Sequence, residues 1–220
     1  MSKALKLLVI FTASTVCGSV QAATPISGIT TFNGPESTAA FGPANGAGLF
    51  AGNVSGYDFR VVTSSAEAIG IYVGDLAWGT GNGVQYYQNS GNAVNMTRFT
   101  VTSNGGEDFN LKGFGVSLTT MNGTDTSVNV VVLGYLDGSQ VGTFSRTLSL
   151  SNGSVQLLEP FDVSGTAGFN LIDEFRIEPG IGSQIGYLGI DNLHAVNFVP
   201  EPSSCSLLLG LGLLRGRRRN

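Results

Sequence analysis

One segment in the middle of the chain restricts the fold more than any other. Residues 128–136 are strongly apolar, Asp137-Gly138 follows them, and a second strand-like run covers residues 141–150. An Asp-Gly pair between two such runs is a strong signal for a β-hairpin, because both turn residues need a positive φ. The segment therefore predicts an antiparallel hairpin whose first strand lies in the centre of a sheet.

Runs of the same kind recur along the chain, whereas helical periodicity is weak except at the two termini. Asn104-Gly105-Gly106 and Asn152-Gly153 are further turn signals. At Gly113 the alternation of apolar residues changes phase, which predicts a β-bulge. Residues 33–53 are rich in Gly, Pro and Ala and are predicted to form an irregular loop. The other predicted strands cover residues 26–32, 57–63, 69–73, 94–102, 109–119, 155–161, 171–178 and 187–198.

About ten short strands without alternating helices predict an all-β fold, either a sandwich or a barrel. We expect an antiparallel β-sandwich of jelly-roll-like type, with the first and last strands close together and the C-terminal segment leaving from a sheet edge. The 32 glycines and the low charged fraction of 12% fit short strands joined by Gly-rich turns. Cys17 and Cys205 both lie in the terminal segments, so the domain between them is expected to contain no internal disulfide.

The N-terminus has the three parts of a secretory signal peptide. Lys3 and Lys6 are followed by a mainly apolar run over residues 7–16 and by small residues around position 22. We expect cleavage after Ala23, with Ala22 as the alternative. A lipoprotein signal at Cys17 is set aside, because that motif needs a small residue where this chain has Val16.

The C-terminus is the more specific end of the chain. Two prolines around a glutamate cannot enter a helix interior or a central strand, so the folded domain is expected to end before Pro200. The apolar run at 205–214 would reach roughly 15 Å as a helix, about half of a hydrocarbon core, which suits a transient membrane anchor. The arginines would hold the end of the chain on the cytoplasmic side. The tail residues in question are Val199, Pro200, Glu201, Pro202, Arg215, Arg217, Arg218 and Arg219.

This order of a Pro-Glu-Pro motif, an apolar segment and an Arg-rich end resembles the PEP-CTERM sorting signal of Gram-negative bacteria, which is also labelled an ice-binding-protein C-terminal domain. The resemblance implies recognition by an exosortase, a membrane-embedded transpeptidase-like enzyme, and a role near the envelope or in an exopolysaccharide matrix. It covers about the last tenth of the chain. We therefore expect a signal peptide at 1–23, a β-sandwich domain at 24–198 and a sorting tail at 199–220.

The domain between the two ends is acidic. Residues 24–199 contain 14 Asp and Glu against five Lys and Arg, a net charge of about −9. This balance argues against nucleic acid as a partner, because nucleic acid binding needs a basic surface. It is compatible with a bound cation.

Catalytic signals are weak. His194 is the only histidine, no Gly-x-Ser-x-Gly elbow is present, and a structural role is expected for His194 in the face that it shares with Val196 and Phe198. One histidine without a domain cysteine also provides too few ligands for zinc. The adjacent pairs Glu107-Asp108 and Asp173-Glu174 are interpreted as solvated turn and edge residues. We therefore expect that the protein is not an enzyme. A jelly-roll enzyme that acts on polysaccharide is the least favoured of the functions considered.

Calcium is the one cofactor that the sequence leaves open. The residues from Phe175 to Glu178 and from Tyr187 to Leu193 resemble the final strands of β-sandwich modules, many of them carbohydrate-binding. Asp191 lies in the strand where such modules often place a structural calcium ligand, and Glu36 in the first long loop is a candidate second ligand. The alternative for Asp191 is a bulge or turn.

Trp78, Tyr86 and Tyr87 are the candidate carbohydrate-binding residues. They occur in a Gly-rich, loop-like stretch at 75–89 next to Asn and Gln side chains. An exposed ring can cover the apolar face of a sugar while amides bind its hydroxyls. The alternative is that Trp78 and one of the tyrosines belong to the core.

Together these features predict an exported structural protein of the cell surface or extracellular matrix. Signal peptidase and an exosortase would be its partners during export, the membrane a transient one, and exopolysaccharide a partner at its destination. A carbohydrate-binding module is the alternative function.

Overall fold

The computed structural model describes residues 27–35, 37–74, 83–88, 95–155 and 158–197, and the observations below concern these residues. They contain strands and turns, and no helix among them is long and apolar enough to span a membrane. The predicted all-β class is confirmed. The strands are β1 (Ser27–Thr30), β2 (Ser37–Pro43), β3 (Leu49–Val54), β4 (Tyr57–Thr63), β5 (Ala68–Val73), β6 (Val84–Gln88), β7 (Met96–Ser103), β8 (Phe109–Thr120), β9 (Ser127–Leu136), β10 (Ser139–Ser149), β11 (Glu159–Asp162), β12 (Glu174–Pro179) and β13 (Ile185–Asn197).

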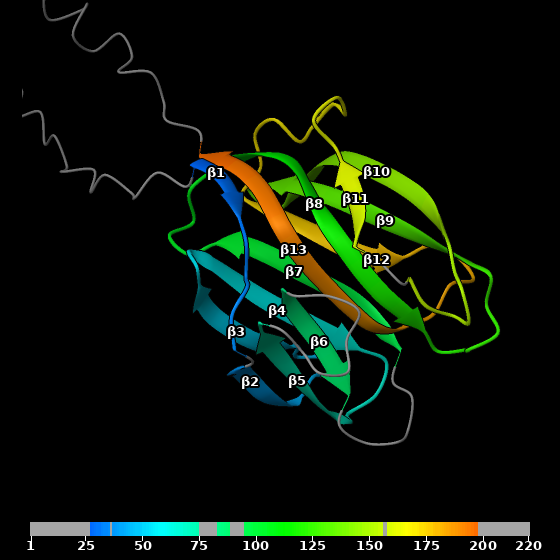
Figure 1. The fold of residues 1–220 in the computed structure, drawn as a ribbon. Helices are drawn as coiled ribbons and strands as arrows, with labels where there is room; N and C mark the ends of the chain where they lie inside the picture. The colour runs from blue at the N-terminus through cyan, green and yellow to red at the C-terminus, as the bar shows by residue number, and fades with distance from the viewer. Residues whose placement is uncertain (1–26, 36, 75–82, 89–94, 156–157, 198–220) are drawn as a thin grey trace, which may run out of the picture.

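These strands form two layers. One layer has the order β3-β4-β7-β12-β9-β10, and the other has the order β2-β5-β6-β13-β8-β11, with β1 paired to the end of β13. Among the named strands, the only backbone pairing between the two layers is that of Ile185 in β13 with Met96 in β7. Figure 1 shows β13 and β8 lying in front of β7, β12 and β9. All pairs of named strands are antiparallel, so the predicted antiparallel β-sandwich is confirmed.

The path of the chain between the layers is jelly-roll-like. Every connection from β6 to β9, and again from β10 to β13, crosses from one layer to the other. Ser27 of β1 pairs with Val196 of β13, which confirms that the first and last strands are neighbours. β13 is not an edge strand, however, because β8 lies along one side of it and β1 and β6 along the other. The strand that precedes the C-terminal segment is therefore an internal one, whereas the segment itself, which was expected to leave from a sheet edge, lies outside the described residues.

The central hairpin is present as predicted. Asp137 has a φ of 51° and Gly138 a φ of 74°, and these two residues connect β9 to β10. β9 lies between β10 and β12, which confirms that it is an internal strand. Asn152 and Gly153, with φ values of 51° and 71°, make a second tight turn of the same kind.

Three strands occupy stretches that were predicted to be loops. β2 and nearly all of β3, which ends at Val54, lie within residues 33–53, and β6 lies within residues 75–89. β2 and β3 are edge strands, so each has one neighbour and a largely exposed surface. Gly, Ala and Pro are tolerated there, because an edge strand needs fewer backbone donors and fewer packed side chains than a central one.

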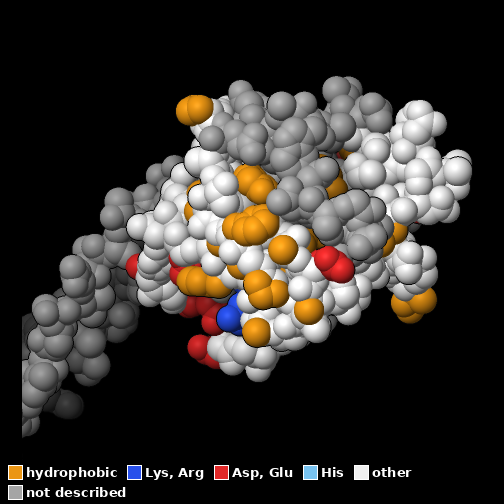
Figure 2. All heavy atoms as spheres, turned by 90° about the horizontal axis from the view of Figure 1, so that it is seen from below, with side chains coloured by type: hydrophobic (Ala, Val, Ile, Leu, Met, Phe, Trp, Pro, Cys, Tyr) orange, Lys and Arg blue, Asp and Glu red, His pale blue; other side chains and the backbone are white. Residues whose placement is uncertain are grey.

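The edge strands also leave large apolar side chains at the surface. Phe41 of β2 is 52% exposed and Phe50 of β3 is 53% exposed. Figure 2 shows hydrophobic side chains gathered on the lower face of the molecule, with a few charged ones among and beside them. Most of the apolar side chains of the central strands are instead buried between the layers.

Aromatic rings connect the two layers through the core. Phe114 of β8 stacks on Phe175 of β12 with a distance of 5.2 Å between the ring centroids. Phe109 contacts Phe175 edge-on at 6.4 Å, and Phe161 of β11 stacks on Phe114 at 5.6 Å. Each of these rings is at most 4% exposed. Buried aromatic side chains therefore supply much of the contact that holds the sandwich together.

A bulge in β8 allows odd-numbered residues before it and even-numbered residues after it to point into this core. Leu111 and Phe114 are both buried although they are three positions apart. The register between β8 and β13 passes from His194 opposite Gly113 to Ala195 opposite Leu111, so Lys112 is the extra residue. The irregularity predicted at Gly113 is confirmed.

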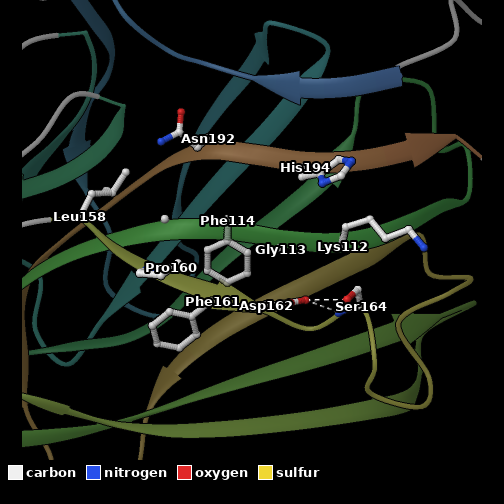
Figure 3. Close-up of a pocket in the computed structure, with 11 residues that line it drawn as sticks. Lys112, Gly113, Phe114, Leu158, Pro160, Phe161, Asp162, Ser164, Asn192 and His194 are labelled. Carbon is white, nitrogen blue, oxygen red and sulfur yellow. Dashed lines mark hydrogen bonds between the residues drawn. The ribbon is translucent and has the colours of Figure 1, made fainter.

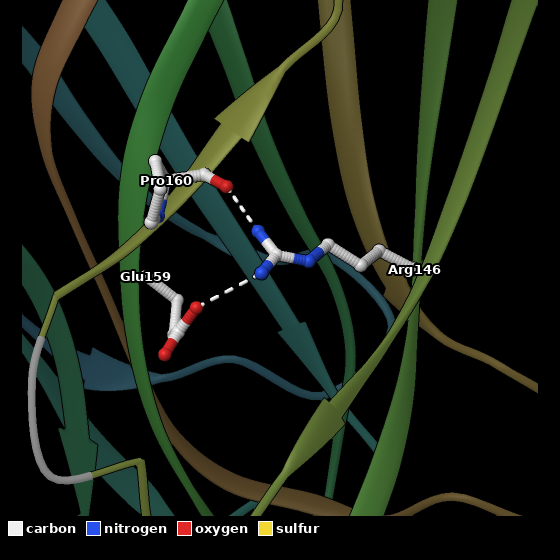
Figure 4. A network of polar contacts seen from close by, with 3 residues as sticks. All are labelled: Arg146, Glu159 and Pro160. Carbon is white, nitrogen blue, oxygen red and sulfur yellow. Dashed lines mark hydrogen bonds and ion pairs between the residues drawn. The ribbon is translucent and has the colours of Figure 1, made fainter.

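One arginine closes the open edge between the layers. Arg146 of β10 forms an ion pair with Glu159 of β11, with 3.0 Å between Nη2 and Oε2. Its Nη1 donates a hydrogen bond to the Pro160 carbonyl, as Figure 4 shows, and its guanidinium carbon lies 5.5 Å from the centre of the Phe161 ring. Both charged side chains are more than a third exposed, so the ion pair contributes at most about 1 kcal/mol to stability.

Candidate functional site

A groove lies on the outer surface of β8, β11 and β13. It has a volume of about 480 Å³ and lies directly over the bulge. Its polar side chains are Lys112 of β8, Asp162 of β11, Ser164, and Asn192 and His194 of β13. Leu158 and Pro160 form an apolar wall (Figure 3). We call this hollow the bulge groove.

Strand alternation explains why Lys112 and His194 face this groove. Their neighbours Leu111, Leu193 and Ala195 are fully or almost fully buried in the core, so the residues between them point to the other face. His194 is half-buried, as is Val196 on the same face. The face that they share is therefore the outer surface of the sandwich, and not the packed one.

A second irregularity on β13 places Asn192 beside them. Asp191 is opposite Gly115 and His194 is opposite Gly113, so two residues of β13 correspond to one of β8. Asn192 has a φ of 51°, a conformation that Asn adopts more easily than most residues. Its side chain is exposed and lines the groove.

Asp162 is fixed by its own turn. Its Oδ1 accepts hydrogen bonds from the Ser164 backbone N–H at 2.9 Å and from the Ser164 hydroxyl at 2.6 Å. These bonds hold the pKa of Asp162 below its usual value, and nearby His194 has a smaller effect in the same direction. Asp162 is therefore an ionised acceptor at neutral pH with lone pairs left for a ligand.

The floor of the groove consists of glycine backbone. A Cβ on Gly115 would lie 2.4 Å from a methyl carbon of Leu158, and one on Gly113 would lie 2.4 Å from the Phe161 carbonyl oxygen. At Gly113 the close contact is with backbone, so β8 can approach β11 this closely only with glycine there, whereas at Gly115 the Leu158 side chain would have to move aside. The Val163 N–H also donates a 2.9 Å hydrogen bond to the Lys112 carbonyl, which ties the end of β11 to β8.

The polar groups of the groove suit binding better than nucleophilic catalysis. In a catalytic triad the histidine stands between the serine and the acid. Here the Ser164 hydroxyl donates directly to Asp162. The groove instead offers a cation, an imidazole, an amide and a carboxylate around a partly apolar wall, which is the usual composition of a small-molecule or sugar site.

The predicted calcium ligands are only partly within the described residues. Asp191 is 5% exposed, and its Oδ1 accepts a 3.0 Å hydrogen bond from the Phe32 backbone N–H. Glu36 lies outside the described residues. Among the residues that the structure describes, no group of three or more His, Cys, Asp and Glu side chains could hold a metal ion. Calcium at Asp191 stays a prediction.

The predicted aromatic site loses one member. Tyr86 is 0% exposed and packs in the core, and this burial raises the pKa of its hydroxyl. A buried ring cannot cover a sugar, so the assignment of Tyr86 as a surface sugar contact was wrong. The reason is that β6 lies between β5 and β13, which gives its alternate residues Val84 and Tyr86 an inner face to fill. Trp78 and the side chain of Tyr87 lie outside the described residues.

Sequence reasoning missed a buried polar contact between β6 and β13, on the face of their layer that points away from the other layer. The Tyr187 hydroxyl donates a hydrogen bond to the side-chain carbonyl of Gln85, and both residues are almost fully buried. Burial raises the pKa of Tyr187 to about 12. The two residues are 102 positions apart, and neither lies in a motif that would connect them.

The adjacent carboxylate pairs meet at one end of the sandwich. Asp173 and Glu174 line a smaller hollow of about 270 Å³. Partial burial raises the pKa of Asp108, and the negative charges of Asp173 and Asp137 raise it further. Glu174 forms an ion pair with Arg176. The sequence predicted solvated pairs but did not indicate that residues from three separate turns would be neighbours.

The predicted sorting residues from Val199 to Arg219 also lie outside the described residues, so the tail stays a prediction.

No protein-family model and no curated protein matches the chain. Among solved structures, the chain is similar to a DUF4465 family protein from Bacteroides caccae, with 14% identity, a TM-score of 0.49, and coverage of 76% of this chain and 97% of that one. A DUF4465 family protein from Bacteroides ovatus has 7% identity, a TM-score of 0.38, and coverage of 80% and 100%. An arabinose-bound α-L-arabinofuranosidase has 10% identity and a TM-score of 0.40, and the match spans 77% of this chain but 26% of that one. These likenesses are too weak to assign a family or an activity.

Proposed function

We propose that this chain is an exported structural protein of the cell surface or extracellular matrix of a Gram-negative bacterium, sorted through a PEP-CTERM-like tail at residues 199–220. The order of parts at the C-terminus carries this proposal. β13, the last strand, ends at Asn197, and the Pro-Glu-Pro motif, an apolar run and four arginines follow it. A Pro-Glu-Pro motif, an apolar segment and an Arg-rich end are the parts of the PEP-CTERM sorting signal that this tail resembles.

The position of the two domain ends supports this proposal. β1 begins at Ser27, shortly after the expected cleavage site at Ala23. Because Ser27 pairs with Val196, both ends of the sandwich lie at the same place in the fold. Removal of a signal peptide and of a tail would therefore cut none of the strands that the structure describes.

Mass spectrometry of the protein recovered from its native host tests the proposal. The expected result is a chain that begins at Thr24, lacks part or all of the tail and is found outside the cytoplasm. The double variant Pro200→Ala and Pro202→Ala should retain the tail, whereas the neighbouring variant Ser203→Ala should be processed like the parent. A native chain that extends to Asn220 and stays in the cytoplasm would overturn the proposal.

The bulge groove favours carbohydrate binding as a second function of the same exported domain. Its mixture of donors, acceptors and an apolar wall fits a sugar ring better than it fits a purely apolar or purely charged ligand. A glycan array with the recovered protein tests this function, and saturable binding would support it. Binding to no glycan on the array would leave the structural role alone.

A further inference from the structure

We infer that the bulge groove binds acidic sugars of a matrix polysaccharide, with a uronate carboxylate at Lys112. This inference rests on the proposed function, because it names the class of polymer that the exported domain would contact. It is carried by the charge of the groove, by the arrangement of its polar groups and by the way in which these groups are held.

The charge of Lys112 stands out against an acidic domain. The domain has only five Lys and Arg residues and a net charge of about −9. Among the described residues the ion pairs are those of Arg146 with Glu159 and of Arg176 with Glu174. Lys112 has no carboxylate partner in this part of the chain and is the one Lys or Arg that lines the groove. A ligand carboxylate placed there would gain a charge-assisted hydrogen bond.

The bulge brings His194 to the same end of the groove. The register places His194 opposite Gly113, next to Lys112 on the neighbouring strand. Figure 3 shows both side chains at one end, with Asn192 and Leu158 at the other. The imidazole can donate a second hydrogen bond to an anionic group whose first partner is the Lys112 ammonium. One end of the groove therefore offers two donors, Lys112 and His194, to a single anionic group, and the other end offers neutral groups.

Asp162 excludes ligands that carry negative charge throughout. Its ionised carboxylate is held by Ser164 and lies at the same end of the groove as Lys112 and His194, because Asp162 and His194 both pair with Gly113, from opposite sides of β8. A phosphate or an acidic peptide would place further negative charge beside it, which is unfavourable. A uronate has one carboxylate and several hydroxyls on the same ring. Its hydroxyls can donate to Asp162 while its carboxylate accepts from Lys112.

The remaining wall fits the rest of a sugar ring. Leu158 and the exposed ring of Pro160 provide apolar surface for the C–H face of a pyranose, and the Asn192 amide can pair with a hydroxyl. The volume of about 480 Å³ is within the range of small-molecule sites. The backbone bond between Val163 and Lys112 and the Asp162 turn fix the walls before a ligand arrives, so little ordering is needed on binding.

Isothermal titration calorimetry with the protein recovered from its host tests the inference, with oligogalacturonate and its methyl ester as probes. The two probes share the same sugar chain, and the ester replaces each charged carboxylate by a neutral carboxyl group that carries a methyl. We expect saturable binding of the acid and at least roughly tenfold weaker binding of the ester, the loss expected for one charge-assisted hydrogen bond. Equal binding of both probes, or binding of neither, would overturn the inference.

Three variants locate the site. Lys112→Gln should weaken binding of the acid about tenfold, and Lys112→Arg should restore most of it. Arg60→Gln is the matched control, since Arg60 is an exposed residue of β4 in the opposite layer and its loss changes the net charge equally. If Arg60→Gln weakens binding as much as Lys112→Gln does, binding depends only on the net charge of the protein, and the placement of the carboxylate at Lys112 is wrong. Thermal melts of each variant check that it folds.

The export experiment and the binding experiment fail separately. A protein that is processed and exported but binds no uronate would overturn this inference and leave the proposed function standing. A protein that binds uronate but retains its tail and stays in the cytoplasm would overturn the proposed function and leave the uronate site standing.

Discussion

Phe32 and Asp191 lie 159 positions apart, yet the Phe32 backbone N–H donates a 3.0 Å hydrogen bond to the Asp191 carboxylate. Both residues are at most 5% exposed. The Phe32 ring packs edge-on against Phe59 of β4, with 5.7 Å between the centroids. The bond thus ties the first part of the domain to its last strand beside the bulge groove.

Replacement of Asp191 by alanine should destabilise the domain by about 1–3 kcal/mol, because the Phe32 N–H would remain buried without its acceptor. Urea denaturation measures this loss as a lower midpoint with an unchanged slope. Asp191→Asn is the matched control, since it keeps an oxygen that can accept the bond and should lose less. A midpoint for Asp191→Ala equal to that of the parent would show that the bond contributes nothing.

The calcium site predicted at Asp191 and Glu36 has a direct thermal signature. A cation that binds only the folded state stabilises it by about 2.7 kcal/mol at one hundred times its dissociation constant. Millimolar calcium should therefore raise the melting temperature, and a chelator should reverse the rise. Glu36→Gln should abolish the rise without changing the melting temperature in chelator. No shift with either calcium or chelator would remove calcium from the description of this protein.

The aromatic contact between the layers should dominate stability. Phe175 stacks on Phe114 and touches Phe109, and all three are buried. Phe175→Ala should cost about 3–5 kcal/mol, because it removes the contacts and leaves a cavity. Phe175→Leu should cost less, and Phe41→Ala, at a position that is 52% exposed, should change stability by less than about 0.5 kcal/mol. Similar losses for Phe175→Ala and Phe41→Ala in urea denaturation would contradict this account.

The sequence predicted those parts of the fold that local chemistry decides. The turn at Asp137 and Gly138 needs two positive φ values, and few residue pairs other than Asp-Gly provide them easily. The bulge at Gly113 could be predicted because the apolar residues change from odd to even positions there. A strand can bury both sets in the same core only if it contains an extra residue. In both places the physical requirement lies within a few neighbouring residues.

The missed features depend on partners that are distant in sequence. β2 and β3 become strands because β5 and β4 offer them a free edge, which their own Gly- and Ala-rich sequences do not show. Tyr86 was ambiguous for the same reason, since the neighbours of β6 decide which of its faces turns inward. The bulge groove needs the register of β8 against β13 and the approach of β11, so its residues could not be grouped from spacing alone.

The acidic end of the sandwich should make stability depend on pH and salt. Partial burial raises the pKa of Asp108, and Asp173 and Asp137 raise it further, so the folded state binds a proton at Asp108 more tightly than the unfolded state does. The ionised form therefore lowers stability above the folded-state pKa, and the penalty vanishes as the pH falls below the unfolded-state pKa.

Asp108→Asn, which removes this charge at nearly constant shape, should raise the melting temperature slightly at neutral pH. The gain should shrink in acid, where the parent carboxyl is protonated, and in high salt, which screens the repulsion from Asp137 and Asp173. Asp125→Asn, in the turn between β8 and β9, is the control and should give no comparable gain. Thermal melts across pH and ionic strength decide the matter. A gain that stays the same in acid would show that it does not come from the charge of Asp108, and a loss at neutral pH would show that the carboxylate is favourable where it lies.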